Sequence, residues 1–219
     1  MRFRLIPSLL CLLLLPLHAE PAGKTTVACV GDSITFGSGA KDRSKESYPA
    51  VLQTLLGDDH VVRNFGVGGS TLLRQGDKPY FKQKAHAEAM ALKADIYVVK
   101  LGTNDTKPQN WKHKDQFEAD ARALVGEIRA ANPKARVFLC TPVPAYPGNF
   151  GISDAGIREV GPLVRKVAES EKTMLIDLYT PLSGHPEFFP DKVHPNAAGY
   201  KVLAGAVYEG LTGKKAPAH

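Results

Sequence analysis

The sequence predicts an α/β fold with three layers, a parallel β-sheet covered by helices on both faces. Five apolar runs rich in β-branched residues start at intervals of roughly 35 to 40 residues, and helical patterns fill the gaps between them. The runs show little alternation of apolar and polar side chains, which is typical of parallel strands buried on both sides. The composition is that of a globular protein, with 43% hydrophobic and 23% charged residues.

The elements alternate regularly along the chain. The strands are expected at Thr26–Val30, Val61–Phe65, Ile96–Leu101, Ala135–Cys140 and Thr173–Leu178. The helices are expected at Tyr48–Leu56, Tyr80–Leu92, Asp115–Ala131, Gly156–Ser170 and Ala197–Leu211, and Asp115 with Glu118 fits a capping box. No linker or shift in composition divides the chain, so residues 20–219 are expected to form one domain.

The first 19 residues have the pattern of a secretory signal peptide. Arg2 and Arg4 precede the apolar stretch Leu5–Leu17, and Leu17-His18-Ala19 provides a small-residue exit site. The stretch is too short for a transmembrane helix, and no other segment approaches 18 apolar residues. We therefore expect export to a periplasm or out of the cell, without a stable membrane anchor.

The charge pattern does not indicate a nucleic-acid partner. The whole chain has 28 basic and 22 acidic residues, and the surplus is scattered instead of concentrated on one segment. The sequence does not indicate an oligomeric state.

Polar residues capable of chemistry follow four of the predicted strands. Ser33 comes directly after the first strand in Gly31-Asp32-Ser33, and Asn104 follows the third strand in Gly102-Thr103-Asn104-Asp105. A glycine-rich loop, residues 64–71, follows the second strand. In open α/β sheets, ligands bind at the carboxyl ends of the strands. Taken alone, Ser33 fits an ordinary capping turn equally well, and Asn104 alone fits a turn-forming asparagine better than an oxyanion donor.

The segment after the fifth strand adds a histidine and a carboxylate. Asp191 and His194 are three residues apart in Asp191-Lys192-Val193-His194-Pro195, and the proline keeps His194 out of a helix. This spacing allows the carboxylate to orient the imidazole. Together the four segments supply a nucleophile, a base, an orienting acid and oxyanion donors. The glycine loop lacks the third glycine of a dinucleotide fingerprint, and GxSxG, HExxH and GxxxxGK[ST] are absent.

With these motifs the chain resembles the SGNH/GDSL hydrolases. The blocks GDSIT, NFGVGGST, GTND and DKVHPN match the four motifs of that family in order and span residues 31–196. The resemblance implies a flavodoxin-like sheet with strand order 2-1-3-4-5. It implies Ser33 as nucleophile, His194 as base and Asp191 as third member of the triad. The oxyanion hole would comprise the Ser33 NH, the Gly69 NH and the Asn104 side chain, and no metal or organic cofactor would be needed.

The implied strand order also bears on the cysteines. Strands 1 and 4 would be separated by strand 3, or about 9.6 Å, which exceeds the roughly 7 Å that a disulfide spans. We therefore expect Cys29 and Cys140 to be free and buried.

The expected substrate is an O-acetylated carbohydrate. Asp32, Asp105, Asn110, Trp111 and Tyr146 are expected to line the substrate site, and the loop Pro142–Ser153 also carries Asn149 and Phe150. Aromatic and amide side chains suit a sugar ring, although Trp111 packing its own loop is an equal alternative. The segments GTNDTKPQNWKHKD and Leu182–Pro186 resemble secreted bacterial carbohydrate or sialate O-acetylesterases.

Other interpretations stay open from the sequence. A lysophospholipase or thioesterase would use the same triad on long acyl chains. A metal-dependent phosphoesterase would use Asp32, Asn104, Asp105, Asp191 and His194 as ligands, and a glycan-binding module would keep the fold without turnover. Lys100 interrupts the apolar third strand, either reaching toward the sheet edge or holding an acidic group there.

Overall fold

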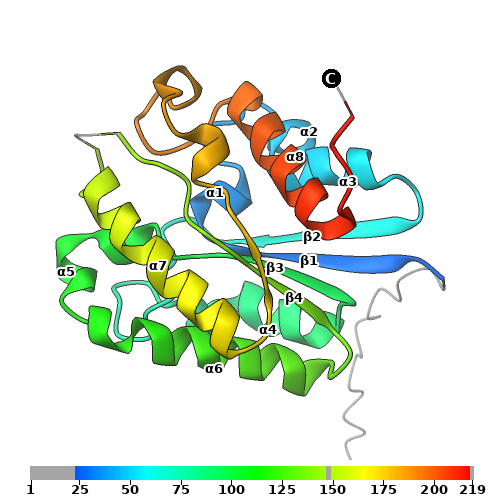
Figure 1. The fold of residues 1–219 in the computed structure, drawn as a ribbon, viewed down its shortest axis with the longest axis horizontal. Helices are drawn as coiled ribbons and strands as arrows, with labels where there is room; N and C mark the ends of the chain where they lie inside the picture. The colour runs from blue at the N-terminus through cyan, green and yellow to red at the C-terminus, as the bar shows by residue number, and fades with distance from the viewer. Residues whose placement is uncertain (1–22, 147–148, 218–219) are drawn as a thin grey trace, which may run out of the picture.

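A five-stranded parallel sheet forms the centre of the computed structural model, which describes residues 23–146 and 149–217 (Figure 1). Its order is β2-β1-β3-β4-β5, and every neighbouring pair is parallel. This confirms the α/β class and the strand order that the family resemblance implied. The expected signal peptide, residues 1–19, lies outside the described residues. The strands are β1 Thr25–Gly31, β2 His60–Gly66, β3 Ile96–Lys100, β4 Arg136–Cys140 and β5 Met174–Ile176.

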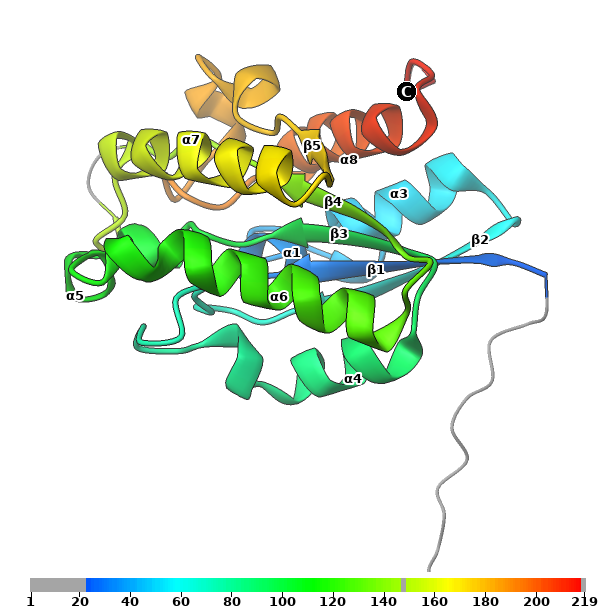
Figure 2. The same ribbon diagram turned by 60° about the horizontal axis from the view of Figure 1, so that its bottom comes forward.

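Helices cover both faces of the sheet, as predicted. Apolar residues of α1, α3 and α8 pack on one face, and those of α4, α6 and α7 pack on the other. Figure 1 places α3 and α8 on the opposite side of the sheet from α4 and α6, and Figure 2 turns α4 and α6 toward the viewer. The helices are α1 Ser33–Phe36, α2 Arg43–Glu46, α3 Tyr48–Leu56, α4 Lys84–Leu92, α5 Pro108–Trp111, α6 Phe117–Ala131, α7 Asp154–Ser170 and α8 Ala197–Thr212.

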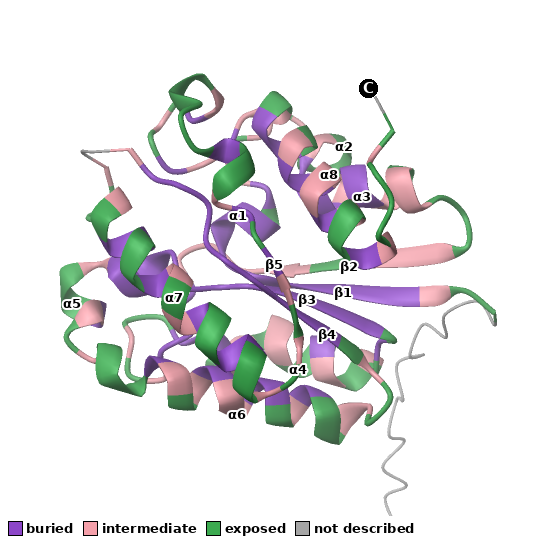
Figure 3. Cartoon of the chain, in the orientation of Figure 1, coloured by how far each residue is buried: buried purple, intermediate pink, exposed green. Residues whose placement is uncertain are grey.

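The central strands are buried because each faces two cores. In β1, Val27 and Cys29 belong to the core under α3 and α8, while Ala28 and Val30 belong to the core under α6 and α7. Successive side chains of a strand point to opposite faces, so both sets must be apolar. Figure 3 accordingly shows β1, β3 and β4 buried along most of their length.

Strand β2 differs from this pattern because it lies at the edge of the sheet. None of its residues is fully buried. Side-chain oxygens accept hydrogen bonds from backbone amides of the strand. Gln53 Oε1 accepts from Val62 N at 2.8 Å, and Asn64 Oδ1 accepts from Gly66 N at 2.9 Å. An edge strand otherwise presents unpaired amides to solvent. At these two amides, side-chain oxygens thus supply the acceptors that a neighbouring strand would otherwise provide.

The fifth strand is shorter than the predicted Thr173–Leu178. Thr141 N still donates to Ile176 O at 3.0 Å, but Leu178 N donates to the Thr141 hydroxyl at 2.8 Å. The Thr141 side chain therefore takes the place of a backbone acceptor in the next hydrogen bond of the ladder, and β5 ends at Ile176.

The helix predicted over Tyr80–Leu92 is divided in two. Tyr80–Lys82 forms a 3₁₀ turn, and α4 begins only at Lys84. Tyr80 is tethered to the glycine loop, since its NH donates to Thr71 O at 2.9 Å and its hydroxyl donates to Phe65 O at 2.7 Å. These long-range contacts keep the first turn out of the helix.

The capping box predicted for α6 is not formed. The helix begins at Phe117 and not at Asp115, and Lys114–Gln116 forms a 3₁₀ turn. Glu118 accepts from Lys166 of α7 at 2.8 Å and from Arg122 at 3.2 Å. Its carboxylate therefore joins two helices instead of turning back to cap its own.

Three short helices, α1, α2 and α5, were not predicted. Each has four residues, which is too short to give a helical period in the sequence. Two of them show the capping signal instead: Asp32 accepts from Ile34 N at 2.9 Å, and Asp42 accepts from Ser44 N at 3.0 Å.

The prediction for the cysteines is confirmed. Cys29 and Cys140 are free and buried, and burial raises the pKa of the Cys29 thiol to about 12. Among the helices of residues 23–146 and 149–217, none is long and apolar enough to cross a membrane.

Candidate active site

The structure brings Ser33, His194 and Asp191 into line at the carboxyl edge of the sheet. Ser33 Oγ lies 2.8 Å from His194 Nε2, and His194 Nδ1 lies 2.6 Å from Asp191 Oδ2. Ser33 and His194 are 161 residues apart in the sequence. Ser33 is largely buried, with 8% of the residue exposed. This is the geometry of a nucleophile, a base and an orienting carboxylate.

Asp191 is held as a carboxylate by its own turn. Its Oδ1 accepts from Val193 N at 3.0 Å and from His194 N at 2.7 Å, while Oδ2 faces the imidazole. Partial burial by itself raises the pKa of Asp191, but these hydrogen bonds from His194 and Val193 outweigh burial and lower it. The carboxylate therefore stays ionised beside the histidine.

Close packing behind Ser33 depends on two glycines. A Cβ at Gly31 would lie 2.0 Å from Thr35 Oγ1 of α1, and one at Gly66 would lie 2.1 Å from Phe36 N of the same helix. Helix α1 begins at Ser33 with Asp32 as its cap, and it could not sit this close to the ends of β1 and β2 with larger residues there.

The loop that carries His194 is fixed from three directions. Asn149 Nδ2 donates to Asp191 O at 2.6 Å, and the Phe150 ring lies 5.6 Å from the imidazole, edge to face. On the third side a Cβ at Gly39 would lie 3.1 Å from His194 Cβ. Asn149 and Phe150 were expected at the rim of the site. Gly39 was not, and its only signal in the sequence is its place just after the Ser33 segment.

The expected oxyanion donors lie on neighbouring turns. Asn104 is 4% exposed, and its Nδ2 donates to Ser70 O at 3.1 Å, next to Gly69 in the glycine loop. Gly69 has φ +78°, a conformation that favours glycine, and a Cβ at Gly68 would come within 4.0 Å of Ser33 Cβ. The glycine loop thus lies directly beside Ser33. The assignment of the Ser33 NH, the Gly69 NH and the Asn104 amide to an oxyanion remains a prediction.

Three residues expected to contact substrate have internal roles instead. Asp32 and Asp105 are fully buried, and Asn110 is 1% exposed. Asp32 pairs with Lys100 at 3.0 Å; Asp105 accepts from Leu73 N at 2.7 Å. Burial raises the pKa of Asp105 to about 7, against the effect of its amide donors. The sequence placed these residues at the correct edge of the sheet but did not reveal that their carboxylates point inward.

Asn110 holds the Asn104 turn through a hydrogen bond to its backbone. Its Nδ2 donates to Asn104 O at 2.9 Å, and its Oδ1 accepts from Asp77 N at 2.8 Å. Its amide is therefore used within the protein and joins the Asn104 turn to Asp77, in the segment that follows the glycine loop.

Trp111 and Tyr146 also pack against the protein. The Trp111 ring lies 6.0 Å from Phe117, and its Nε1 donates to Glu159 of α7 at 2.9 Å. Tyr146 stacks at a tilt on Phe189, with 5.3 Å between ring centres. Of the two alternatives for Trp111, these contacts favour packing of its own loop.

The unexplained Lys100 proves to hold an acidic group. It is fully buried, and its Nζ lies 3.0 Å from Asp32 Oδ2 and 2.6 Å from Thr103 Oγ1. Burial lowers the pKa of Lys100, whereas the neighbouring Asp32 carboxylate raises it.

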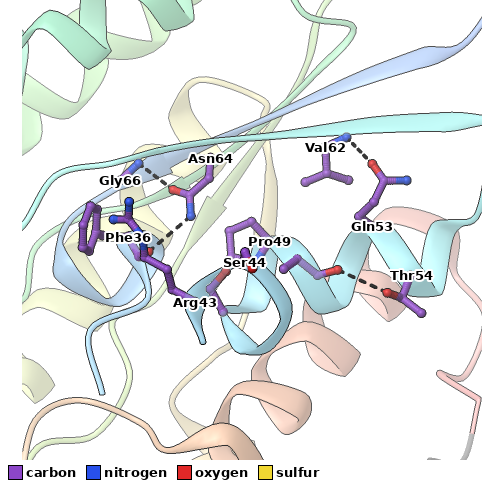
Figure 4. A pocket seen from close by; sticks show the side chains of 11 residues that line it. Phe36, Arg43, Ser44, Pro49, Gln53, Thr54, Val62, Asn64 and Gly66 are labelled. Atoms are coloured by element: carbon purple, nitrogen blue, oxygen red, sulfur yellow. Dashed lines mark hydrogen bonds between the residues drawn. The ribbon is translucent and has the colours of Figure 1, made fainter. Parts of the chain in front are cut away.

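A large surface hollow lies apart from the triad, between β2, α2 and α3 (Figure 4). It has a volume of about 560 Å³ and includes Phe36, with the Arg43 guanidinium 3.9 Å above its ring. The Gln53 and Asn64 amides that line it bond to β2, as Figure 4 shows. These amides serve the strand edge and are not free to bind a ligand.

Metal binding finds no support in the side-chain arrangement. Among residues 23–146 and 149–217, no three His, Cys, Asp or Glu side chains gather so that they could hold an ion. Asp32 and Asp105, considered above as ligands, have Lys100 and backbone amides as partners.

The parallel sheet with helices on both faces, and the contacts among Ser33, His194 and Asp191 at its carboxyl edge, agree with the class of SGNH hydrolases that the four sequence motifs resemble. The model of the GDSL-like lipase/acylhydrolase family matches residues 29–202, and the chain belongs to this family. It is 39% identical over 197 residues to an acetylxylan esterase of Xylanibacter ruminicola, covering 81% of this chain and 41% of that protein. An uncharacterized esterase of Bacillus subtilis is 28% identical, covering 86% of this chain and 52% of the relative.

The chain therefore spans between about two fifths and half of the length of these relatives. Solved structures agree on the fold. A carbohydrate acetylesterase from Sinorhizobium meliloti superposes with a TM-score of 0.73 at 21% identity, covering 87% of this chain and 99% of that one. An arylesterase assigned in Agrobacterium tumefaciens gives 0.72 at 23% identity, with 85% and 98% covered.

Proposed function

We propose that the chain is a serine esterase that removes acetyl groups from a carbohydrate. The observation that carries the proposal is the line of contacts from Ser33 Oγ through the His194 ring to Asp191 Oδ2, at 2.8 and 2.6 Å. Membership of the GDSL-like family and the acetylxylan esterase relative support the ester as the bond that is cleaved.

The proposed reaction has two acyl-transfer steps. His194 Nε2 takes the proton of Ser33 as Oγ attacks the ester carbonyl, and the tetrahedral oxyanion is held by the Ser33 NH, the Gly69 NH and the Asn104 amide. The bond to the alcohol breaks, and His194 gives its proton to the departing oxygen. Water then attacks the acetyl-enzyme with His194 as base, releasing acetate and restoring Ser33. These steps require no metal or organic cofactor.

Replacing Asn104 by alanine is expected to lower kcat about 10²- to 10³-fold, because one donor to the oxyanion is lost. The effect on KM should be small, since the donor acts mainly in the transition state. Steady-state kinetics on p-nitrophenyl acetate test this, and Asn132→Ala provides a matched control. Asn132 also donates its amide to a backbone carbonyl, Ala94 O at 3.0 Å, but at the far end of the sheet. Equal losses of kcat in both variants would contradict the role of Asn104.

The acetyl group and the carbohydrate need separate tests. The exposed face of Phe150, 52% exposed and beside His194, offers an apolar platform suited to a sugar ring. We expect p-nitrophenyl acetate to be hydrolysed at least about tenfold faster than the octanoate, and acetate to be released from acetylated xylan. A preference for octanoate would favour the lysophospholipase or thioesterase alternative.

The remaining alternatives predict different outcomes in the same assay. A metal-dependent phosphoesterase would lose activity with EDTA and would cleave p-nitrophenyl phosphate. A glycan-binding module would bind acetylated xylan without releasing acetate. The paired contacts of Asp32 and Asp105 oppose the first alternative, and the aligned triad opposes the second.

We propose further that residues 1–19 direct export, on the strength of Arg2 and Arg4 before the apolar stretch Leu5–Leu17. An acetylated polysaccharide is too large to enter a cell, so export would bring the enzyme to such a substrate.

A further inference from the structure

A lysine is buried directly behind the two turns that carry Ser33 and Asn104. Lys100 is the last residue of β3, it pairs in the sheet with Gly31, and no part of it is exposed. Its ammonium donates to Asp32 Oδ1 at 3.2 Å, to Asp32 Oδ2 at 3.0 Å and to Thr103 Oγ1 at 2.6 Å. An ammonium has three donors, so these contacts account for its full capacity.

The two partners of Lys100 each belong to a site-bearing turn. Asp32 is the cap of α1, accepting from Ile34 N, and Ser33 is the first residue of that helix. Thr103 precedes Asn104 and forms the start of its 3₁₀ turn, where Thr103 O accepts from Thr106 Oγ1 at 2.8 Å. One charged group thus connects the turn of the nucleophile with the turn of the oxyanion donor.

Stability alone gives a poor account of this arrangement. Lys100 follows Val98 and Val99 and precedes Leu101, all buried, so an apolar side chain would suit the strand. Replacing a buried ion pair by apolar residues is often neutral or stabilising, because desolvation of the charges offsets their attraction. The pair does, however, restrict geometry, since both carboxylate oxygens and the threonine hydroxyl must face one ammonium.

We propose that Lys100 is a positioning residue that fixes the placement of Asn104 relative to Ser33, acting through Asp32 and Thr103. This inference rests on the proposed esterase function. Displacements of about 1 Å in a catalytic site can reduce the rate about 10²-fold, so a loosened connection should reduce kcat while substrate binding persists.

The most selective variant is Thr103→Val, which removes the hydroxyl but keeps the shape and leaves the Lys100–Asp32 pair intact. We expect kcat on p-nitrophenyl acetate to fall about tenfold with KM nearly unchanged. Thr103→Ser, which keeps the hydroxyl, should retain most of the activity. Lys100→Met combined with Asp32→Asn removes both charges together, avoids an unpaired buried carboxylate, and should lower kcat at least as much.

A matched control lies at the opposite end of the same sheet. Thr26 is 9% exposed and donates through Oγ1 to the Asp95 carboxylate at 2.8 Å. Thr26→Val therefore removes a largely buried threonine hydroxyl from a comparable polar contact. It should lower the unfolding temperature without lowering kcat. If Thr26→Val and Thr103→Val reduce kcat alike, the proposal is overturned, because the loss then follows stability.

A double-mutant cycle separates positioning from a general defect. If Lys100 and Thr103 act through Asn104, Thr103→Val should reduce kcat much less in an Asn104→Ala background than in the wild type. Fully additive losses would overturn the proposal. The wild type and Ser33→Ala report on the esterase function itself. A wild type without activity, or an active Ser33→Ala, refutes that function, whereas a normal kcat in Thr103→Val with both controls as expected refutes only the positioning role.

Discussion

Replacing Ser33 by alanine is expected to lower kcat for ester hydrolysis by about 10⁴-fold or more. In the proposed mechanism Ser33 Oγ attacks the ester while His194 Nε2, which lies 2.8 Å away, takes its proton. The turn itself should persist, because Gly37 N and Ser38 N donate to the backbone carbonyl of Ser33 at 3.0 and 2.9 Å. The loss is thus expected in chemistry and not in folding.

The measurement is release of p-nitrophenol from p-nitrophenyl acetate, with and without EDTA. Ser38→Ala serves as the control, since the contacts of Ser38 in this turn are made by its backbone: its NH to Ser33 O and its carbonyl to the Tyr200 hydroxyl. We expect the wild type and Ser38→Ala to be active and insensitive to the chelator. Activity that survives in Ser33→Ala, or vanishes with EDTA, would refute the serine mechanism.

Replacing Asp191 by asparagine is expected to lower kcat by about 10⁴-fold without unfolding the protein. The asparagine oxygen can still accept from Val193 N and His194 N, which leaves the amide NH₂ facing His194 Nδ1. An NH₂ group donates, so Nδ1 must then accept and the proton moves to Nε2. In that tautomer Nε2 cannot accept the proton of Ser33.

A second aspartate offers a close control for this change. Asp177 Oδ1 accepts from Tyr179 N at 2.9 Å and from Thr180 N at 3.2 Å, and its Oδ2 accepts from a side chain, as in the Asp191 turn. Hydrogen bonds also lower the pKa of Asp177 against the opposing effect of burial. Asp177→Asn should cost comparable stability and leave kcat unchanged. Matching kcat losses in the two variants would show that turn stability, not imidazole orientation, controls the rate.

The sequence predicted well those features that depend on local pattern. The buried strands repeat at regular intervals, and the four motifs each follow a strand, so the pattern alone indicates that the motifs meet at one edge of the sheet. That inference extends to the contact between Ser33 and His194, although the sequence separates them by 161 residues.

Features that depend on distant partners could not be predicted in the same way. Glu118 has the spacing of a capping residue, yet Lys166 of α7 attracts its carboxylate. Asp32 and Asp105 occupy motif positions that suggest substrate contact, but the direction of a side chain is decided by groups such as Lys100, which lies 68 residues from Asp32. As an aromatic residue, Trp111 could form a platform for a sugar ring, but its contact with Phe117 shows that it packs against the protein. Residue type and position alone do not separate these alternatives.

The placement of β1 between β2 and β3 has a consequence for how the chain acquires its site during folding. Strand β1 can pair on both of its edges only after β2 and β3 have been synthesised. Ser33 can contact His194 only after the segment just before the last helix has been synthesised. Contacts between such distant segments close late, because the entropy of loop closure opposes them until neighbouring structure is in place. A growing chain that has reached the end of β5 therefore contains Ser33 but not His194, and the contact between them forms only when the fold is nearly complete.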